Sequence, residues 1–186
     1  MLSARGSLLL IVDAQAGLAR AVEDAARCLH RTRLLLTTAR ELRVPAVVSE
    51  QYPEGLGPTD PRLLDQLTDA VVLAKRAFSC WREPVLRAAL ETAGRRQIVV
   101  TGMEAHVCVQ QTALDLAAAG FSTHVCADAV ASRRAEDRNL GLERLRDHGV
   151  DIVTAESVVF EWLERSDIPA FKALAPHIKA SGDVPG

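Results

Sequence analysis

The stretch LLLIVD at residues 8–13 shows the pattern that decides the fold: five consecutive apolar residues end at an aspartate. A short run that is apolar at every position is typical of a β-strand buried on both faces of a sheet. Similar runs, apolar at most positions, recur at residues 45–49, 70–74, 97–101, 122–127 and 150–154. The sequence therefore predicts six buried strands.

Segments with helical patterns separate these runs. Pro45 cannot continue the helix predicted before it, and Gly120 and Gly149 are typical of residues that follow a helix. Asp60 followed by Pro61 is typical of a helix start. The predicted helices cover residues 23–43, 61–68, 82–93, 107–119, 135–148, 156–165 and 168–180.

Strands that alternate with helices predict an α/β fold, because parallel neighbours in a sheet need long crossover connections. We expect a three-layer α-β-α domain around a six-stranded, doubly wound parallel sheet of the Rossmann-like kind. The 186 residues correspond to one domain with a substantial core. We assign this domain to residues 1–180 and expect residues 181–186 to form a flexible C-terminal tail.

Charge and composition exclude several classes of partner. Lys and Arg number 22 against 24 Asp and Glu, so the net charge of −2 gives no basic footprint for nucleic acid. The apolar run at residues 8–12 is too short for a signal peptide or a membrane span. The four cysteines form no CxxC pair and are typical of reduced thiols, which predicts a cytoplasmic protein.

Chemically active side chains follow three of the predicted strands. Asp13 follows the first strand, Lys75 the third, and Cys108 lies where the segment after the fourth strand enters a helix. Ligands of open α/β sheets bind beyond the carboxyl ends of the strands, so we expect these residues to converge. A helix start and a nearby ammonium favour a thiolate. Asp13 is suited to take the thiol proton and return it to a leaving amine, as in a cysteine hydrolase.

Three motifs together resemble the isochorismatase-like cysteine hydrolase superfamily. They are LLLIVDAQ at 8–15, KRAFS at 75–79 and GMEAHVCV at 102–109, followed by QTALDL at 111–116. The resemblance covers about residues 7–165, and QYPEGLG at 51–57 is similar to the branch of isochorismatase-domain-containing proteins. It implies an Asp13-Lys75-Cys108 triad. It also implies a cis peptide between Met103 and Glu104, which aims the backbone N–H groups of Glu104 and Cys108 at a substrate oxyanion.

The resemblance also narrows the expected chemistry. Nicotinamidases of this superfamily carry an Asp and two His after the second strand as metal ligands. Residues 49–58 contain no His, and only Glu50 and Glu54 offer ligand atoms. We therefore expect no metal and no cofactor. The presence of Cys108 favours attack on a carbonyl carbon, and hence hydrolysis of a C–N bond in a small molecule through a thioester-like intermediate.

Six further residues near the strand ends are candidates for contact with substrate. Gln15, Gln51 and Tyr52 lie on strand-end loops, where turn or interface packing is an equal alternative. Phe78 and Trp81 are candidates for a pocket wall, for the core or, for Trp81, for a subunit contact. His106 lies two residues before Cys108 and does not face it at a helix start, so we expect it to line the pocket rather than form a dyad.

Other functions of this sheet type lack their motifs here. A dinucleotide-binding protein needs G-x-G-x-x-G after the first strand, where DAQAG stands. An aspartyl phosphatase needs a second carboxylate at Gln15, and a receiver domain needs an aspartate at Lys75. The remaining alternative is a catalytically idle family member that acts as an oligomeric interaction protein. The resemblance itself implies a homo-oligomer, a dimer or larger.

Overall fold

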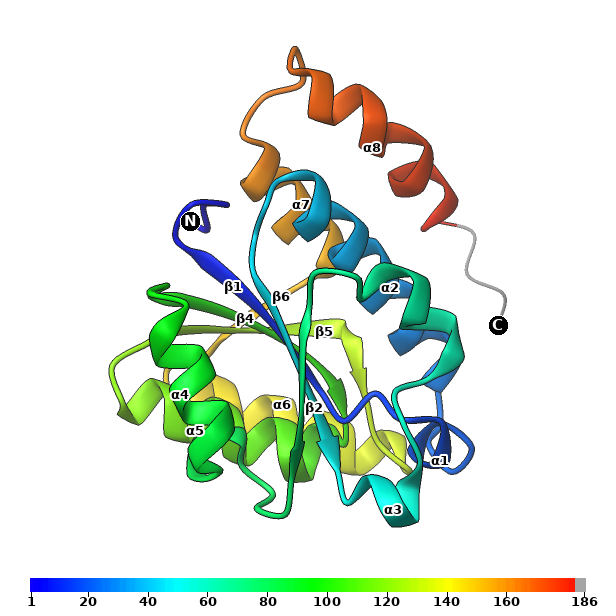
Figure 1. The fold of residues 1–186 in the computed structure, drawn as a ribbon, viewed down its shortest axis with the longest axis vertical. Helices are drawn as coiled ribbons and strands as arrows, with labels where there is room; N and C mark the ends of the chain where they lie inside the picture. Colours follow the sequence, from blue (N-terminus) through cyan, green and yellow to red (C-terminus); the bar gives the residue numbers. More distant parts are fainter. Residues whose placement is uncertain (183–186) are drawn as a thin grey trace.

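The computed structural model of the chain describes residues 1–182 (Figure 1). Six parallel strands form one sheet in the order β3-β2-β1-β4-β5-β6, which confirms the predicted fold class. The order reverses between β1 and β4, so the carboxyl ends of these two strands mark the switch point of the sheet. The strands are β1 Ser7–Val12, β2 Ala46–Gln51, β3 Val71–Lys75, β4 Gln97–Met103, β5 Ser122–Ala131 and β6 Asp151–Val153.

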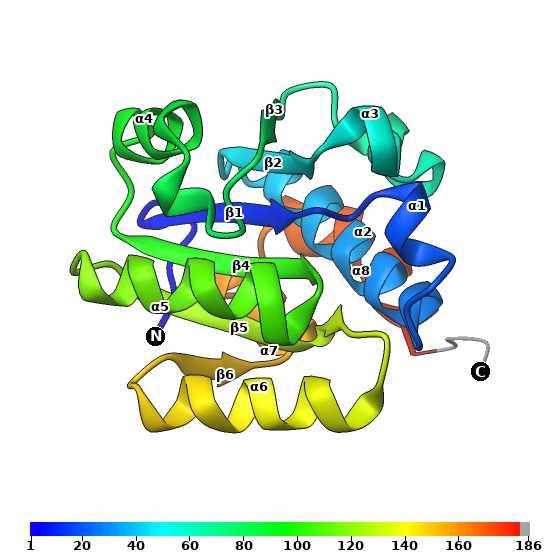
Figure 2. The ribbon, with the colours of Figure 1, turned by 90° about the horizontal axis from the view of Figure 1, so that it is seen from below.

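Helices cover both faces of the sheet, and β1 contributes to both cores. Leu8, Leu10 and Val12 belong to the core on one face, whereas Leu9 and Ile11 belong to the core on the other. All five side chains are fully buried, each worth about 1.5–3 kcal/mol of transfer free energy. The first face carries α4 Pro84–Thr92, α5 Gln110–Ala118 and α6 Ala135–Asp147; the second carries α2 Ala25–Glu41, α7 Ala155–Leu163 and α8 Pro169–Ala180 (Figures 1 and 2).

Two short helices that the sequence patterns did not predict lie beyond the carboxyl ends of the strands. They are α1 Ala16–Ala19, after β1, and α3 Pro53–Leu56, after β2 (Figure 2). Each spans four residues, too few for a hydrophobic periodicity to show in the sequence. Within residues 1–182, no helix combines the length and apolarity that a membrane crossing requires.

Several predicted boundaries move in the structure. The predicted helix at 61–68 is a 3₁₀ helix, Pro61–Gln66, opened as expected by Asp60, which accepts a hydrogen bond from the N–H of Arg62 at 3.0 Å. The predicted helix at 107–119 begins earlier, with a π-helical turn over Ala105–Val109. Of the predicted tail, Ser181 is buried and its hydroxyl donates to the carbonyl of Ile178, while residues 183–186 lie outside the described part.

Gly102 allows β4 to pass close to β1 at the switch point. Its φ is +115°, and a Cβ placed there would lie 1.9 Å from the carbonyl oxygen of Val12. Gly102→Ala is therefore expected to lower the free energy of unfolding by about 3 kcal/mol or more, through backbone strain and a steric clash. Gly94 is the matched control, because its φ is +64° and a Cβ added there would meet no atom within 4 Å.

Urea unfolding of the two variants separates strain from clash. Gly94→Ala is expected to cost about 1 kcal/mol, from the positive φ alone. Equal losses in the two variants would show that the approach of Gly102 to Val12 is not the source of the effect.

Candidate active site

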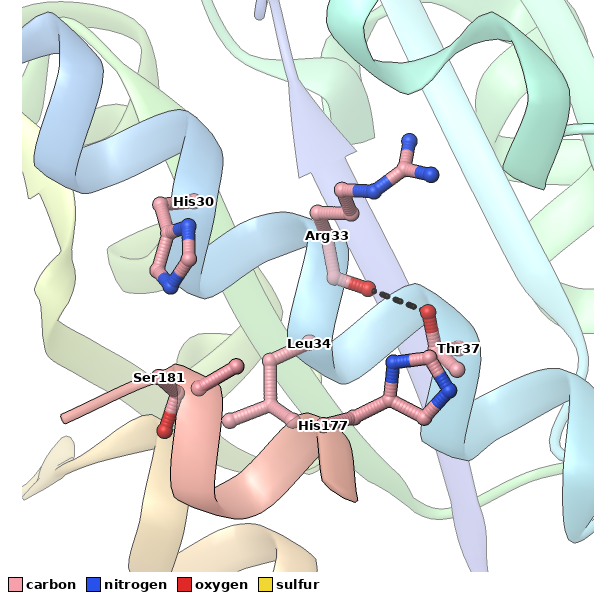
Figure 3. Close-up of a pocket in the computed structure, with 7 residues that line it drawn as sticks. His30, Arg33, Leu34, Thr37, His177 and Ser181 are labelled. Carbon is pink, nitrogen blue, oxygen red and sulfur yellow. Dashed lines mark hydrogen bonds between the residues drawn. The ribbon is translucent and has the colours of Figure 1, made fainter. Parts of the chain in front are cut away.

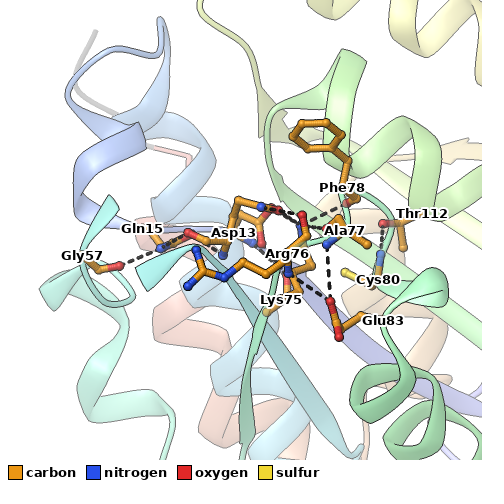
Figure 4. Close-up of polar contacts among 12 residues, drawn as sticks. Asp13, Gln15, Gly57, Lys75, Arg76, Ala77, Phe78, Cys80, Glu83 and Thr112 are labelled. Carbon is orange, nitrogen blue, oxygen red and sulfur yellow. Dashed lines mark hydrogen bonds and ion pairs between the residues drawn. The ribbon is translucent and has the colours of Figure 1, made fainter. Parts of the chain in front are cut away.

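A buried ion pair lies at the carboxyl edge of the sheet. Asp13 directly follows β1 and Lys75 is the last residue of β3. Lys75 Nζ lies 2.8 Å from Asp13 Oδ2, and neither side chain is exposed to solvent. The ammonium also donates to Gln51 Oε1 at 2.6 Å. It donates to the carbonyl oxygen of Phe78 at 3.0 Å (Figure 4). A buried charge pair persists only with such additional hydrogen bonds, because both ions have lost their hydration.

The surroundings of Asp13 set its protonation. Its φ is +50°, and its Oδ1 accepts a hydrogen bond of 2.6 Å from the hydroxyl of Ser49. Burial raises the pKa of the Asp13 carboxyl above its ordinary value, and Lys75 and Ser49 oppose that rise. Burial lowers the pKa of Lys75, but the charge of Asp13 and its neighbours raises it on balance. Lys75 is therefore a cation at neutral pH.

Cys108 lies beside this pair on the π-helical turn between β4 and α5. Its exposed fraction is 6%. Burial raises the pKa of the Cys108 thiol, the charge of Asp13 raises it further, and Lys75 lowers it less. The ammonium favours a thiolate as expected, but burial and the carboxylate of Asp13 outweigh its effect on the pKa of the thiol. The group is a thiol while Asp13 is charged.

The loop after β5 holds the turn that carries Cys108. The peptide bond between Met103 and Glu104 is cis. The carboxylate of Glu104 accepts hydrogen bonds from the backbone N–H and from Nε of Arg133, at 2.9 and 3.0 Å. His106 Nδ1 lies 2.9 Å from the hydroxyl of Ser132. His106 is thus bonded to this loop.

Gln15 and Gln51 organise the site from within the protein. Gln15 is fully buried, and its side-chain amide donates to the carbonyl groups of Gln51 and Gly57 at 3.0 and 2.6 Å. Its Oε1 accepts from the N–H of Gln51 at 2.8 Å. The polar atoms of Gln15 are thus engaged by backbone groups, as in the alternative of turn packing, and its contact with substrate stays a prediction. Gln51 binds the ammonium of Lys75 and donates through Nε2 to the carbonyl of Arg76.

Of the three aromatic residues predicted to contact substrate, two are exposed and one is half-buried. Tyr52 and Phe78 are exposed, and the guanidinium of Arg76 stacks 4.3 Å from the centre of the Tyr52 ring. Trp81 is half-buried and packs edge-to-face on Phe121, with ring centres 5.3 Å apart. Tyr52 and Phe78 remain available to a substrate or to a second subunit, whereas Trp81 belongs to the packing near α5.

The two carboxylates considered as metal ligands are engaged elsewhere. Glu50 Oε1 accepts hydrogen bonds from the N–H and the hydroxyl of Thr59, both at 2.7 Å. Glu54 pairs with Arg76 at 3.1 Å. Across residues 1–182, no three side chains among His, Cys, Asp and Glu gather as a metal-binding group would.

Two further residues lie near Asp13. Ser49, near the end of β2, was not predicted from the sequence as a member of the site, whereas Cys80, on the 3₁₀ turn Cys80–Arg82, was expected near this edge as the one other thiol that could react. Cys80 is fully buried, and burial together with the charge of Asp13 raises the pKa of its thiol to about 11. Its backbone N–H donates to the hydroxyl of Thr112 at 2.9 Å (Figure 4). Serine is an ordinary packing residue in sequence, so no signal distinguished Ser49.

A separate hollow of about 230 Å³ lies between α2 and α8. His30, Arg33 and His177 line it (Figure 3). The guanidinium of Arg33 is paired with Asp65, and the hydroxyl of Thr37 donates to the carbonyl of Arg33 at 3.0 Å. None of the three triad positions lines this hollow.

Comparison with known proteins identifies the family. The Isochorismatase domain model matches residues 7–157. Isochorismatase domain-containing protein 1 of Danio rerio is 47% identical over 154 residues, which are 82% of this chain and 53% of that protein. The chain thus spans about half the length of this relative.

Solved structures show the same fold. The structure of MAR1 ribonuclease from Caenorhabditis elegans has a TM-score of 0.91 and 32% identity, and the match covers 100% of this chain and 94% of the other. The YcaC gene product of Escherichia coli, described as an octameric hydrolase of unknown specificity, has a TM-score of 0.89 and 25% identity, with 98% and 93% covered. The resemblance drawn from the motifs is confirmed: this chain belongs to the isochorismatase family.

Proposed function

We propose that the protein is a cysteine-dependent hydrolase that cleaves an amide-type C–N bond of a small molecule. The observation that supports this proposal is the ion pair of Asp13 and Lys75, at 2.8 Å, buried beside the thiol of Cys108. Two charges without solvent contact are costly to the fold, so their placement next to a nucleophile favours a chemical role. The E. coli relative is itself described as a hydrolase.

In the acylation step, the Cys108 thiol gives its proton to Asp13 while its sulfur attacks the carbonyl carbon of the substrate. The oxygen of the resulting tetrahedral intermediate carries the negative charge. The backbone N–H groups of Glu104 and Cys108 are the proposed donors to this oxyanion. Asp13 then returns the proton to the nitrogen as the C–N bond breaks, which releases the amine and leaves a thioester on Cys108.

In the deacylation step, water attacks the thioester and gives a proton to Asp13. The carbon–sulfur bond breaks, the acid product leaves, and the proton on Asp13 restores the thiol. Lys75 keeps its charge throughout: it stabilises ionised Asp13 before attack and the sulfur anion during proton transfer. The raised pKa of Asp13 suits this exchange, because a general base works best when its pKa lies closer to the working pH.

Alkylation of the cysteines tests the nucleophile without knowledge of the substrate. Iodoacetamide labelling across a pH series, read by mass spectrometry, is expected to modify Cys108 about tenfold or more faster than Cys28 or Cys126 near neutral pH. The rate at Cys108 is expected to rise once as Asp13 ionises and again as the thiol itself ionises. Cys28 is fully buried in the core on the opposite face of the sheet from Cys108, so this thiol is a suitable internal reference.

A screen of small amides for ammonia release follows from a positive labelling result. Cys108→Ala is expected to abolish the release, and Cys126→Ala, which removes a thiol buried in the core, is expected to retain it. Labelling of Cys108 no faster than of Cys28 and Cys126 would show that the nucleophile assignment is wrong.

We also propose that the protein forms a homo-oligomer. The E. coli relative is described as an octamer, and Tyr52 and Phe78 expose aromatic surface near the site. Sedimentation velocity of the purified protein tests this proposal, with a species of 20.1 kDa as the contradicting result.

A further inference from the structure

The acid and the amine of the site come from strands that are not neighbours. Asp13 follows β1 and Lys75 ends β3, and β2 lies between these two strands in the sheet. Strands two positions apart are separated by about 10 Å, yet the charged atoms lie 2.8 Å apart. The two side chains therefore meet over the carboxyl end of β2. The residues of β2 at that place decide whether the pair forms.

Ser49 of β2 contacts Asp13 directly. It pairs in register with Val12, the residue before Asp13. Its hydroxyl donates to Asp13 Oδ1 at 2.6 Å, and the backbone N–H of Asp13 donates to the carbonyl and the hydroxyl oxygens of Ser49, at 3.1 and 3.2 Å. Ser49 and Asp13 are both fully buried. One carboxylate oxygen is thus held by Ser49, and the other faces Lys75.

We propose that Ser49 is a positioning residue for Asp13, which it holds in the orientation that serves Cys108. This inference rests on the proposed function. A hydroxyl has a single hydrogen to donate, and Ser49 donates it to the carboxylate of Asp13. This hydrogen bond restricts the rotation of the Asp13 carboxylate about its last side-chain torsion.

The second effect of Ser49 concerns the charge of Asp13. A donor to a carboxylate favours the ionised form and lowers the pKa of the group. Ser49 therefore opposes the rise that burial imposes on Asp13. Loss of the hydroxyl leaves Asp13 protonated to a higher pH, and the base is then unavailable to Cys108 over that interval.

The test compares three variants by the pH dependence of Cys108 alkylation. Ser49→Ala and Ser49→Val are expected to move the lower-pH rise upward by about one pH unit, so the rate at a given pH on that rise falls about tenfold. Ser49→Thr keeps the hydroxyl in the shape of valine and is expected to retain the wild-type midpoint. The Thr and Val pair separates the hydrogen bond from the volume of the side chain.

Ser7→Ala is the matched control for loss of a buried serine. Ser7 is fully buried on β1, and its hydroxyl accepts a hydrogen bond from Trp162 Nε1 at 2.9 Å, far from the site. It is expected to lower stability without moving the pH profile. A midpoint in Ser49→Ala or Ser49→Val within about 0.3 pH unit of the wild type would overturn the proposal.

The outcome also distinguishes this inference from the proposed function. If wild-type Cys108 labels no faster than Cys28, the nucleophile assignment fails and the role of Ser49 fails with it. If wild-type Cys108 labels fast and Asp13→Asn removes the lower-pH rise, but the Ser49 variants leave it in place, the triad stands and only the positioning role is overturned.

Discussion

Asp13→Asn is expected to slow amide hydrolysis but to lower the pH at which the Cys108 thiolate forms. Amide hydrolysis falls by a factor of about 10² to 10⁴, because no group remains to take the thiol proton and return it to the leaving amine. Alkylation of Cys108, in contrast, is expected to show a single rise at a lower pH than the thiol rise of the wild type. The charge of Asp13 is the second largest cause of the raised pKa of Cys108, and asparagine removes it while Lys75 stays.

The opposite signs separate a general base from a structural residue. A variant that merely misfolds also loses hydrolysis, but it exposes the buried Cys28 and Cys126 as well, so labelling rises at every cysteine rather than at Cys108 alone. Mass spectrometry of alkylated Cys108 and ammonia release, measured on the same preparation, give both readings. Asp115→Asn is the control, because it changes a carboxylate on α5 that pairs with Arg82. Hydrolysis by Asp13→Asn within threefold of the wild-type rate, or an unchanged alkylation profile, contradicts the proposed role.

The sheet could be predicted because each of its strands corresponds to a short, mostly apolar run in the sequence. β1 is buried at all six positions, and its run of residues 8–12 has no polar member. The prediction that every strand is buried on both faces is wrong for β3. Val71 and Val72 are 49% and 42% exposed, because β3 is the edge strand of the sheet. Sequence alone does not say which run lies at an edge.

The ends of the strands and helices near the site were harder to predict, because the backbone there is irregular. The register of β4 and β5 shifts between Val100 and Gly102, and β5 continues through Asp128 to Ala131. Asp128 thus lies within the strand, and its carboxylate accepts a hydrogen bond from the N–H of Ala155 at the start of α7. A bulge and a π-helical turn leave no periodic signal in the sequence.

The sequence could predict those residues of the candidate site that lie at the carboxyl ends of strands. Asp13, Lys75 and Cys108 follow separate strands, and carboxyl ends of parallel strands share an edge. The contacts that each polar side chain makes could not be predicted in this way. Gln51 was a candidate for substrate binding, yet it bonds to Lys75 at 2.6 Å. Whether an amide faces a ligand or a buried ion depends on distances of a few ångströms that spacing in sequence does not specify.

Lys75→Met is expected to destabilise the fold through the partner it leaves behind. Methionine matches the length of the lysine stem but removes the charge, so Asp13 becomes a buried carboxylate without its cation. Breaking a buried ion pair in this way costs about 3–5 kcal/mol. The free energy of unfolding from urea titration at neutral pH is therefore expected to fall by that amount. Alkylation of Cys108 also slows, because Lys75 is the group that lowers the pKa of the thiol.

The double variant Asp13→Asn/Lys75→Met shows whether the orphaned charge is the cause. Removal of both ions is expected to recover most of the lost stability, since an uncharged pair carries no desolvation penalty. A Lys75→Met variant that loses less than about 1 kcal/mol, or a double variant less stable than Lys75→Met, contradicts this account.

The pH dependence of Lys75→Met follows from the sign of the shift at Asp13. Burial raises the pKa of this carboxyl, and loss of Lys75 removes the main opposing charge. A carboxyl whose pKa is higher in the folded state binds its proton more tightly there, so its contribution to stability is full below the unfolded pKa of about 3.9. That contribution is lost as the pH rises through the folded pKa. Relative to the double variant, Lys75→Met is therefore expected to lose stability steadily from about pH 4 upward. If the difference in the free energy of unfolding between the two variants stays constant across this range, Asp13 is not the group that titrates.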